Sequence, residues 1–285
     1  MSRKLFLGAL TAGLLASGAA FAAPINNVGG VGVPLGNDTI TQNDFETLIT
    51  SPGSNFMGVG QVTSIFGGTP FSTGYTYGQN GVYLLDEFSG FTVRAIDNAD
   101  ASGNPIDPTK PITISLTGGE LNYYTFSSDI LPTLLSQSTA QAAVNLVKSG
   151  SLWLSLTPVA EDANNDTVII TIPTSANLFS VGKSNASADL DVNLALNGAA
   201  TGFFNTCTIA DSNAPGPVAG AHDCLAGFAS LSFTGGGQNN AQGPFQVGGT
   251  DNLIAVSVPE PLSMSLFGGG LIGAAALRRR KAKKA

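Results

Sequence analysis

Short hydrophobic runs separated by turn residues are the feature that most restricts the fold of this 285-residue chain. Gly, Pro, Asn and Asp stand between the runs, which is typical of short strands joined by turns. We therefore expect a mainly β protein, an antiparallel β-sandwich or jelly-roll-like single domain. The runs, rich in β-branched and aromatic residues, are 59–66, 82–85, 91–97, 112–117, 121–126, 152–157, 168–172, 190–196, 228–233 and 253–257.

Three local signals refine this expectation. Gly118-Gly119 predicts a hairpin turn between the runs 112–117 and 121–126. Residues 131–147 place their leucines and valines on one stripe, which predicts the one substantial helix of the domain. Thr41 and Asp44 resemble a helix-start box and predict a short helix that continues to about Ile49.

The N-terminus has the three parts of a secretory signal. Arg3 and Lys4 are followed by an apolar run from Leu5 to Ala16, and small residues stand at Ala20 and Ala22. This order predicts a signal peptide over residues 1–22, exported by the Sec route and cut by signal peptidase after Ala22.

The C-terminus carries a second apolar segment. Leu262 to Leu277 contains 16 uncharged residues, fewer than the roughly 20 that span a bilayer as a helix. Thinning of the bilayer and snorkelling of basic side chains can cover this deficit. A basic cluster follows and predicts a cytoplasmic end over residues 278–285. The cluster begins with Arg278, Arg279, Arg280 and Lys281.

The two membrane-directed ends leave residues 23–257 as the exported domain. Directly after it stand Val258, Pro259, Glu260 and Pro261. Two prolines around one residue keep this stretch extended and outside any helix. An extended segment beside a membrane helix is a shape that a processing enzyme can hold.

The order of a VPEP motif (258–261), an apolar helix (262–277) and an arginine cluster resembles the PEP-CTERM sorting signal. The resemblance covers only residues 258–285, the sorting tail. It implies recognition by an exosortase, a membrane-embedded enzyme similar to a cysteine transpeptidase. It also implies a Gram-negative source that forms biofilms or flocs, and a precursor held in the inner membrane before it reaches the periplasm, cell surface or extracellular matrix. A sorting signal is an address and does not specify an activity.

The exported domain is strongly acidic. It holds four of the 12 basic residues and 18 of the 19 acidic ones, a formal charge of −14. Binding to nucleic acid needs clustered Lys and Arg, so this composition excludes nucleic acid as a partner. The charge instead favours solubility and divalent cations.

Both cysteines of the chain, Cys207 and Cys224, lie in the exported domain. An exported chain meets an oxidising compartment, so we predict one disulfide between them. On the chain-entropy model, closing so short a loop contributes about 3 kcal/mol.

Acidic loops are the strongest ligand signal in the sequence. Asp162, Asn164 and Asp166 open like a calcium loop but depart from the EF-hand pattern at Thr167 and Pro173. Asp and Asn are also the usual residues of turns. Ca²⁺ is the only cofactor that the sequence suggests. A second oxygen-rich loop contains Asp97, Asp100, Asn104 and Asp107.

From these signals we expect a non-enzymatic domain with a structural or adhesive role in an extracellular polysaccharide. Two alternatives stay open at this point. The first is a secreted polysaccharide-acting enzyme that uses paired carboxylates. The second is a surface protein that binds a small ligand or calcium. The carboxylates available to an enzyme include Glu46, Glu87, Glu120 and Glu161.

Overall fold

The computed structural model describes residues 25–257 apart from 69–70, 161, 175, 179–183, 205–208, 211–227 and 230. The signal peptide with Ala20 and Ala22, both cysteines and the sorting tail with its basic cluster therefore lie outside the described residues. Within the described part, no helix is long and apolar enough to cross a membrane.

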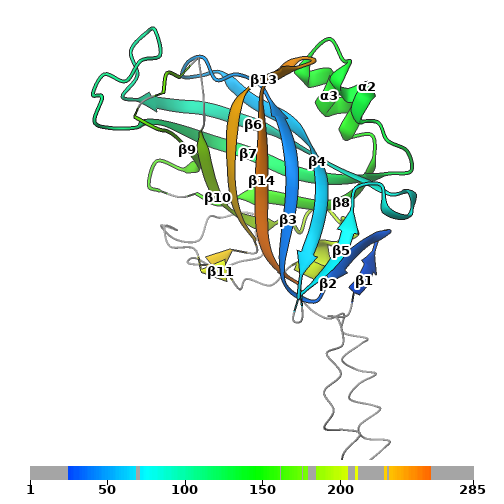
Figure 1. The fold of residues 1–285 in the computed structure, drawn as a ribbon. Coiled ribbons are helices and arrows are strands. Elements are labelled where there is room, and N and C mark those ends of the chain that lie inside the picture. The colour runs from blue at the N-terminus through cyan, green and yellow to red at the C-terminus, as the bar shows by residue number, and fades with distance from the viewer. Residues whose placement is uncertain are drawn as a thin grey trace, which may run out of the picture.

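One antiparallel sheet dominates the fold (Figure 1). Its strands follow the order β13-β14-β3-β4-β6-β7-β8-β10-β9, with β5 paired to β4. The expected mainly β, antiparallel class is confirmed. The strands are β3 (Gly36–Glu46), β4 (Asn55–Gly67), β5 (Ser72–Thr76), β6 (Tyr83–Asp97), β7 (Ile112–Phe126), β8 (Ser151–Pro158), β9 (Asp166–Ile172), β10 (Asn185–Val192), β13 (Leu231–Gln242) and β14 (Phe245–Ser257).

The sheet closes on itself. Strand β10 pairs with β13 from Ala186↔Gly235 to Leu190↔Leu231, which joins the two ends of the strand order. Strands β8 and β9 lie end to end between β7 and β10 and pair with both. These ten strands thus form one continuous sheet around an interior, where the sequence had suggested two stacked sheets. Closure satisfies backbone groups that separate sheets would leave at their edges.

The predicted helix from Thr41 is wrong, because these residues belong to β3. Along β3, Asp38, Ile40, Gln42 and Asp44 are buried, and the residues between them are partly exposed. Pairing with β14 and β4 on either side imposes this two-residue period. The sequence did not indicate a strand here because the inward face of β3 is itself mostly polar.

The predicted hairpin at Gly118-Gly119 is also wrong, since β7 continues through both glycines. Gly118 and Gly119 adopt φ values of 71° and 96°, and Gly90 of β6, beside them, adopts 78°. Such backbone angles favour glycine, so the pair bends a long strand where the sequence suggested a reversal. The predicted helix over 131–147 is two short ones, α2 (Leu131–Leu135) and α3 (Ala140–Val147).

The core has two parts. The larger part fills the interior of the closed sheet, with fully buried residues such as Leu84, Leu116 and Trp153. The smaller part lies on the outer face, where α2 and α3 cover Phe45, Val59 and other apolar side chains of the sheet.

A small hairpin packs against one end of the sheet. It consists of β1 (Ile25–Val28) and β2 (Val31–Pro34), and its valines join the larger core. Trp153 Nε1 donates a hydrogen bond of 2.8 Å to the carbonyl of Val28. The remaining described elements are η1 (Gln79–Gly81), α4 (Thr201–Phe204), β11 (Ile209–Ala210) and β12 (Phe228–Ala229).

Candidate functional site

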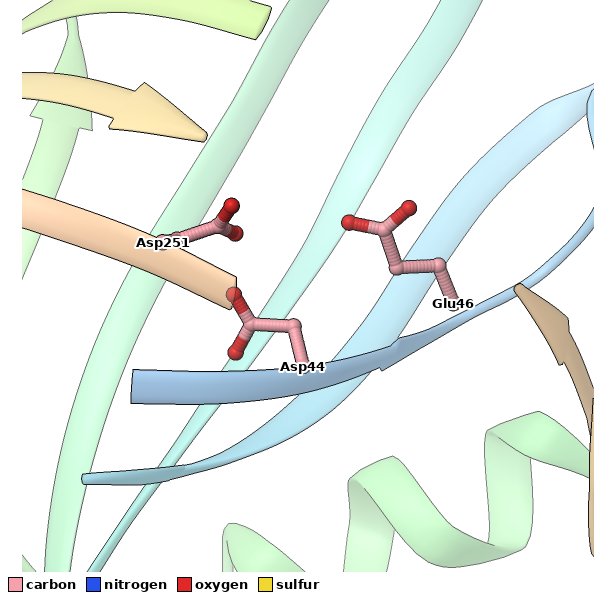
Figure 2. A group of neighbouring side chains, drawn as sticks. All are labelled: Asp44, Glu46 and Asp251. Atoms are coloured by element: carbon pink, nitrogen blue, oxygen red, sulfur yellow. The ribbon is translucent and has the colours of Figure 1, made fainter. Parts of the chain in front are cut away.

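Four carboxylates come together on the inner face of the closed sheet. Asp44 and Glu46 come from β3, Asp251 from β14 and Asp86 from β6. Figure 2 shows the carboxyl groups of Asp44, Glu46 and Asp251 pointing toward one another. One oxygen from each of these three lies within 4.8 Å of the others. We refer to the four residues as the carboxylate cluster.

Strand register builds the carboxylate cluster. Asp44 of β3 and Asp86 of β6 both pair with Gly60 of β4, so they flank that glycine on the same face. On the other side of β3, Gln42 pairs with Asp251. Residues distant in the sequence thus become cross-strand neighbours.

Glycines provide the space for these side chains. A Cβ atom at Gly60 would collide with carboxyl oxygens of both Asp44 and Asp86, and one at Gly235 would collide with Asp251. Gly60 is therefore the point on which Asp44 and Asp86 converge. Any larger residue there would push the two carboxylates apart.

Only part of the hydrogen-bonding capacity of the cluster is met by protein donors. Gln42 Nε2 donates to Asp44 Oδ2 at 3.1 Å, and Tyr123 Oη fixes that amide by donating to Gln42 Oε1 at 2.7 Å. The amide of Gly236 donates to Asp251 Oδ1 at 3.1 Å. Asp44 Oδ1 and both oxygens of Asp86 are buried without any hydrogen-bond donor.

No described cation neutralises the cluster. Arg94, Lys110 and Lys148, the cations within the described ranges, pair with other carboxylates. Burying an unpaired carboxylate costs several kcal/mol unless it binds a proton or a cation. The cluster is therefore a place where positive charge must be supplied.

Burial is the main cause of the raised pKa values in the cluster. It raises the pKa of Asp86 well above its usual range, and nearby Asp251 and Glu87 raise it further. Burial also raises the pKa of Asp44, and the neighbouring charges of Asp86 and Asp251 raise it further. Burial followed by Asp251 and Asp86 raises the pKa of Glu46 to about 8. Without a cation, protons are the available counter-charge.

A cavity of about 60 Å³ adjoins the cluster. Its polar side is formed by Gln42, Asp44, Glu46 and Asp251, and its other walls are mostly apolar, including Phe56 and Leu190. A site for one water needs roughly 10–15 Å³, so the cavity has room for an ion with a few waters. A second hollow of about 410 Å³ shares Asp44 and Gly237 with it.

The three described glutamates that the sequence offered to an enzyme lie in two separate places. Glu46 lies in the carboxylate cluster, whereas Glu87 and Glu120 lie beside α3, where Lys148 Nζ is 3.5 Å and 2.7 Å from their respective Oε1 atoms. Asn122 Nδ2 also donates to Glu87 Oε1 at 2.7 Å. Glu161 lies outside the described residues.

The predicted calcium loop is held by internal contacts. Asp162 accepts hydrogen bonds from Asn164 and from the amide of Asp166, which are contacts typical of a turn. Both carboxyl oxygens of Asp166 bind the guanidinium of Arg94. In the second loop, Asp100 and Asp107 likewise accept hydrogen bonds from nearby amides. Calcium at either loop stays a prediction.

Sequence reasoning missed the carboxylate cluster. Asp44 was assigned to a helix start, and Asp86 and Asp251 gave no signal of their own. The available hint was the alternation Ile40, Gln42, Asp44, Glu46, a two-residue period carried mostly by polar residues. Such a pattern normally indicates a solvent-facing side of a strand.

The comparisons with known proteins identify the tail. Residues 257–281 match the PEP-CTERM protein-sorting motif, as the sequence predicted. This motif marks the chain as an exported, membrane-passing precursor that exosortase processes. No curated protein matches the chain.

Two solved structures show only weak likeness. One is a nonspecific heme-binding cyclase that catalyses [4 + 2] cycloaddition in neoabyssomicin biosynthesis, with a TM-score of 0.22 and 8% identity over 84% of this chain and 73% of that one. The other is Ail, the attachment invasion locus protein of Yersinia pestis, with a TM-score of 0.13 and 7% identity over 78% of this chain and 98% of that one. Scores this low support no conclusion about fold or function.

Proposed function

We propose that the exported domain is a non-enzymatic module of a surface or matrix protein and that its carboxylate cluster binds Ca²⁺. The observation that carries the proposal is the convergence of Asp44, Glu46 and Asp251, whose oxygens lie within 4.8 Å of one another. Asp86 gives independent support, because it is fully buried beside them with both oxygens lacking donors.

The chemistry of the cluster favours a hard cation. Its side-chain ligand atoms are all oxygens, which suit Ca²⁺, Mg²⁺ or Mn²⁺. Zn²⁺ prefers nitrogen and sulfur ligands, which the cluster does not offer. Oxygens bind Ca²⁺ at about 2.3–2.6 Å, so ligands on opposite sides of the ion are up to about 5 Å apart. Mg²⁺ holds its ligands at about 2.0–2.1 Å and would need a tighter cluster.

The proposal extends the sequence-based expectations. It includes export through Sec, cleavage by signal peptidase and final residence at the cell surface or in the matrix. It also includes a structural or adhesive role within an extracellular polysaccharide. A bound ion would cross-link β3, β14 and β6 from inside the sheet and so stabilise the domain outside the cell.

Thermal unfolding of the purified full-length precursor in detergent tests the calcium site. Saturating Ca²⁺ should raise the unfolding temperature: at 100 times Kd the stabilisation is about 2.7 kcal/mol. For a domain of this size, each kcal/mol shifts the midpoint by about 2–4 °C. Mg²⁺ at the same concentration should have a smaller effect.

Two matched variants locate the site. Asp251→Asn should abolish the calcium effect because it removes a carboxylate from the cluster. Asp162→Asn changes the acidic loop in the same way and should leave the effect intact. Stabilisation that survives Asp251→Asn but disappears in Asp162→Asn would move the ion to the loop. No stabilisation of wild type would leave protons as the counter-charge and refute the proposal.

A further inference from the structure

The two ends of the described domain meet at the same end of the closed sheet. Strand β1 begins at Ile25, and β14 finishes at Ser257 beside the β1–β2 hairpin (Figure 1). Ser257 Oγ donates to the carbonyl of Pro34 at 2.7 Å and accepts from the amide of Gly36 at 3.1 Å. These contacts hold the last strand residue firmly against the fold.

Only four residues connect this end of the domain to the apolar segment of the sorting tail. Ser257 is fixed in the sheet, and the apolar segment of the sorting tail begins at Leu262. Five residues span at most about 17 Å when fully extended. The polar layer of a bilayer is roughly 5–8 Å thick on each side. While the tail spans the membrane, this end of the domain must therefore lie close to the lipid headgroups.

Exposed apolar side chains gather at the same end. Phe71 is 68% exposed and Ile25 is 48% exposed. Phe71 directly precedes β5, which packs against β2 of the hairpin. Leu194 and Leu196 lie in the loop before Ala199, and Ala199 adjoins Gly29 of the hairpin turn. Four of the six large exposed hydrophobic residues of the described chain are therefore at this end.

The opposite end provides a contrast. Strand β6 starts near the hairpin, where Val82 adjoins Gly30, and runs for 15 residues to Asp97. Ile106 follows in the connection to β7 and is 71% exposed. A strand of this length extends about 50 Å, so Ile106 lies far from Phe71 and from the end of β14.

We propose that the end formed by the β1–β2 hairpin, Phe71 and the loop with Leu194 and Leu196 rests on the phospholipid surface of the membrane in the precursor. The exposed apolar side chains enter the headgroup layer, which accommodates amphipathic and aromatic groups. The carboxylate cluster then lies away from the membrane, and the sorting motif is presented at the lipid surface. This inference rests on the tail and the fold, and it is independent of calcium binding.

Fluorescence quenching in reconstituted precursor tests the orientation. Full-length Phe71→Trp and Ile106→Trp variants are placed in phosphatidylethanolamine–phosphatidylglycerol vesicles that contain a lipid spin-labelled at its headgroup. Trp153, the only tryptophan of the chain, is buried and contributes the same background to both. Phe71→Trp should lose most of its added emission, whereas Ile106→Trp should keep it.

Three outcomes would overturn the proposal. The first is equal quenching of the two variants, or none, at any protein-to-lipid ratio. The second is quenching of Phe71→Trp only after exosortase is added, which would assign this end to the enzyme. The third is protection of Phe71→Trp that grows with protein density, which would indicate a second copy of the chain. Because no calcium is needed, these results do not depend on the proposed cation site.

Discussion

At the scale of single residues, Asp86 is the least expected feature of the domain. It stands near the start of β6, fully buried, and neither oxygen receives a hydrogen bond. A carboxylate in this position destabilises a protein unless a proton or an ion compensates it. Its position beside Asp44 is explained if the pair serves to bind a cation.

Asp86→Asn should therefore have opposite effects in two buffers. With a chelator near neutral pH, the variant should unfold at a higher temperature than wild type, because wild type must take up a proton to bury Asp86 whereas the amide is neutral in both states. With saturating Ca²⁺, it should gain less stability than wild type does. Differential scanning calorimetry in both buffers measures the two effects. A variant less stable than wild type under both conditions would show that Asp86 acts only in packing.

At the scale of elements, helices α2 and α3 cover the smaller part of the core on the outer face of the sheet. Leu134 of α2 and Val144 of α3 are fully buried against apolar side chains of the sheet. Thr139 caps α3, since its Oγ1 accepts a hydrogen bond of 3.2 Å from the amide of Ala142. Helices of five and eight residues are too short to be stable alone, so packing on the sheet maintains them.

Leu134→Ala should destabilise the domain by about 2–5 kcal/mol, because it removes a fully buried side chain and leaves a cavity. Gln141→Ala, on the exposed side of α3, should change stability by only about 0.5 kcal/mol. Chemical denaturation of the two variants gives both values. Equal values would mean that the helices are not part of the cooperative fold.

At the scale of the whole molecule, the acidic charge is divided between surface and interior. Several carboxylates are buried, and one of them lies apart from the cluster near the membrane-facing end. This residue is Asp38, where burial raises the pKa to about 7 and the nearby hydroxyl of Ser257 partly opposes the shift. Its titration makes the stability of the entire domain depend on pH.

The direction in which stability changes with pH follows from proton linkage. The folded state binds the Asp38 proton more tightly than the unfolded state, whose pKa is near 3.8. The stabilising contribution of the protonated side chain is therefore present below that value and is lost as pH rises through about 7. Asp38→Asn should exceed wild type in stability by less at about pH 5 than at about pH 8, because the loss in wild type is complete only above about pH 7.

Urea denaturation of wild type and Asp38→Asn at both pH values measures this difference. Asp100→Asn is the control, because hydrogen bonds in its turn lower the pKa of Asp100 and place its titration below this window. Its effect on stability should be the same at both pH values. A wild-type-to-Asp38→Asn difference that does not change with pH would contradict the assignment.

The sequence by itself determined the sorting signal of this protein and the class of its fold. The sorting tail could be read directly because Val258, Pro259, Glu260 and Pro261 are contiguous and the apolar and basic segments follow them in order. The β class was also accessible, since β-branched runs between turn residues favour strands whatever their partners are. Eight of the ten strands of the main sheet overlap a run predicted from the sequence.

Only the tertiary structure decided how the strands close and which side chains face inward. The pairing of β10 with β13 depends on residues more than forty positions apart, and no local pattern specifies it. Asp44 lies on a polar face that single-strand periodicity assigns to solvent. It is buried because neighbouring strands bring Asp86 and Asp251 around it and Gly60 leaves the space. Local propensity fixed the strands, whereas long-range pairing determined the interior and therefore the candidate site.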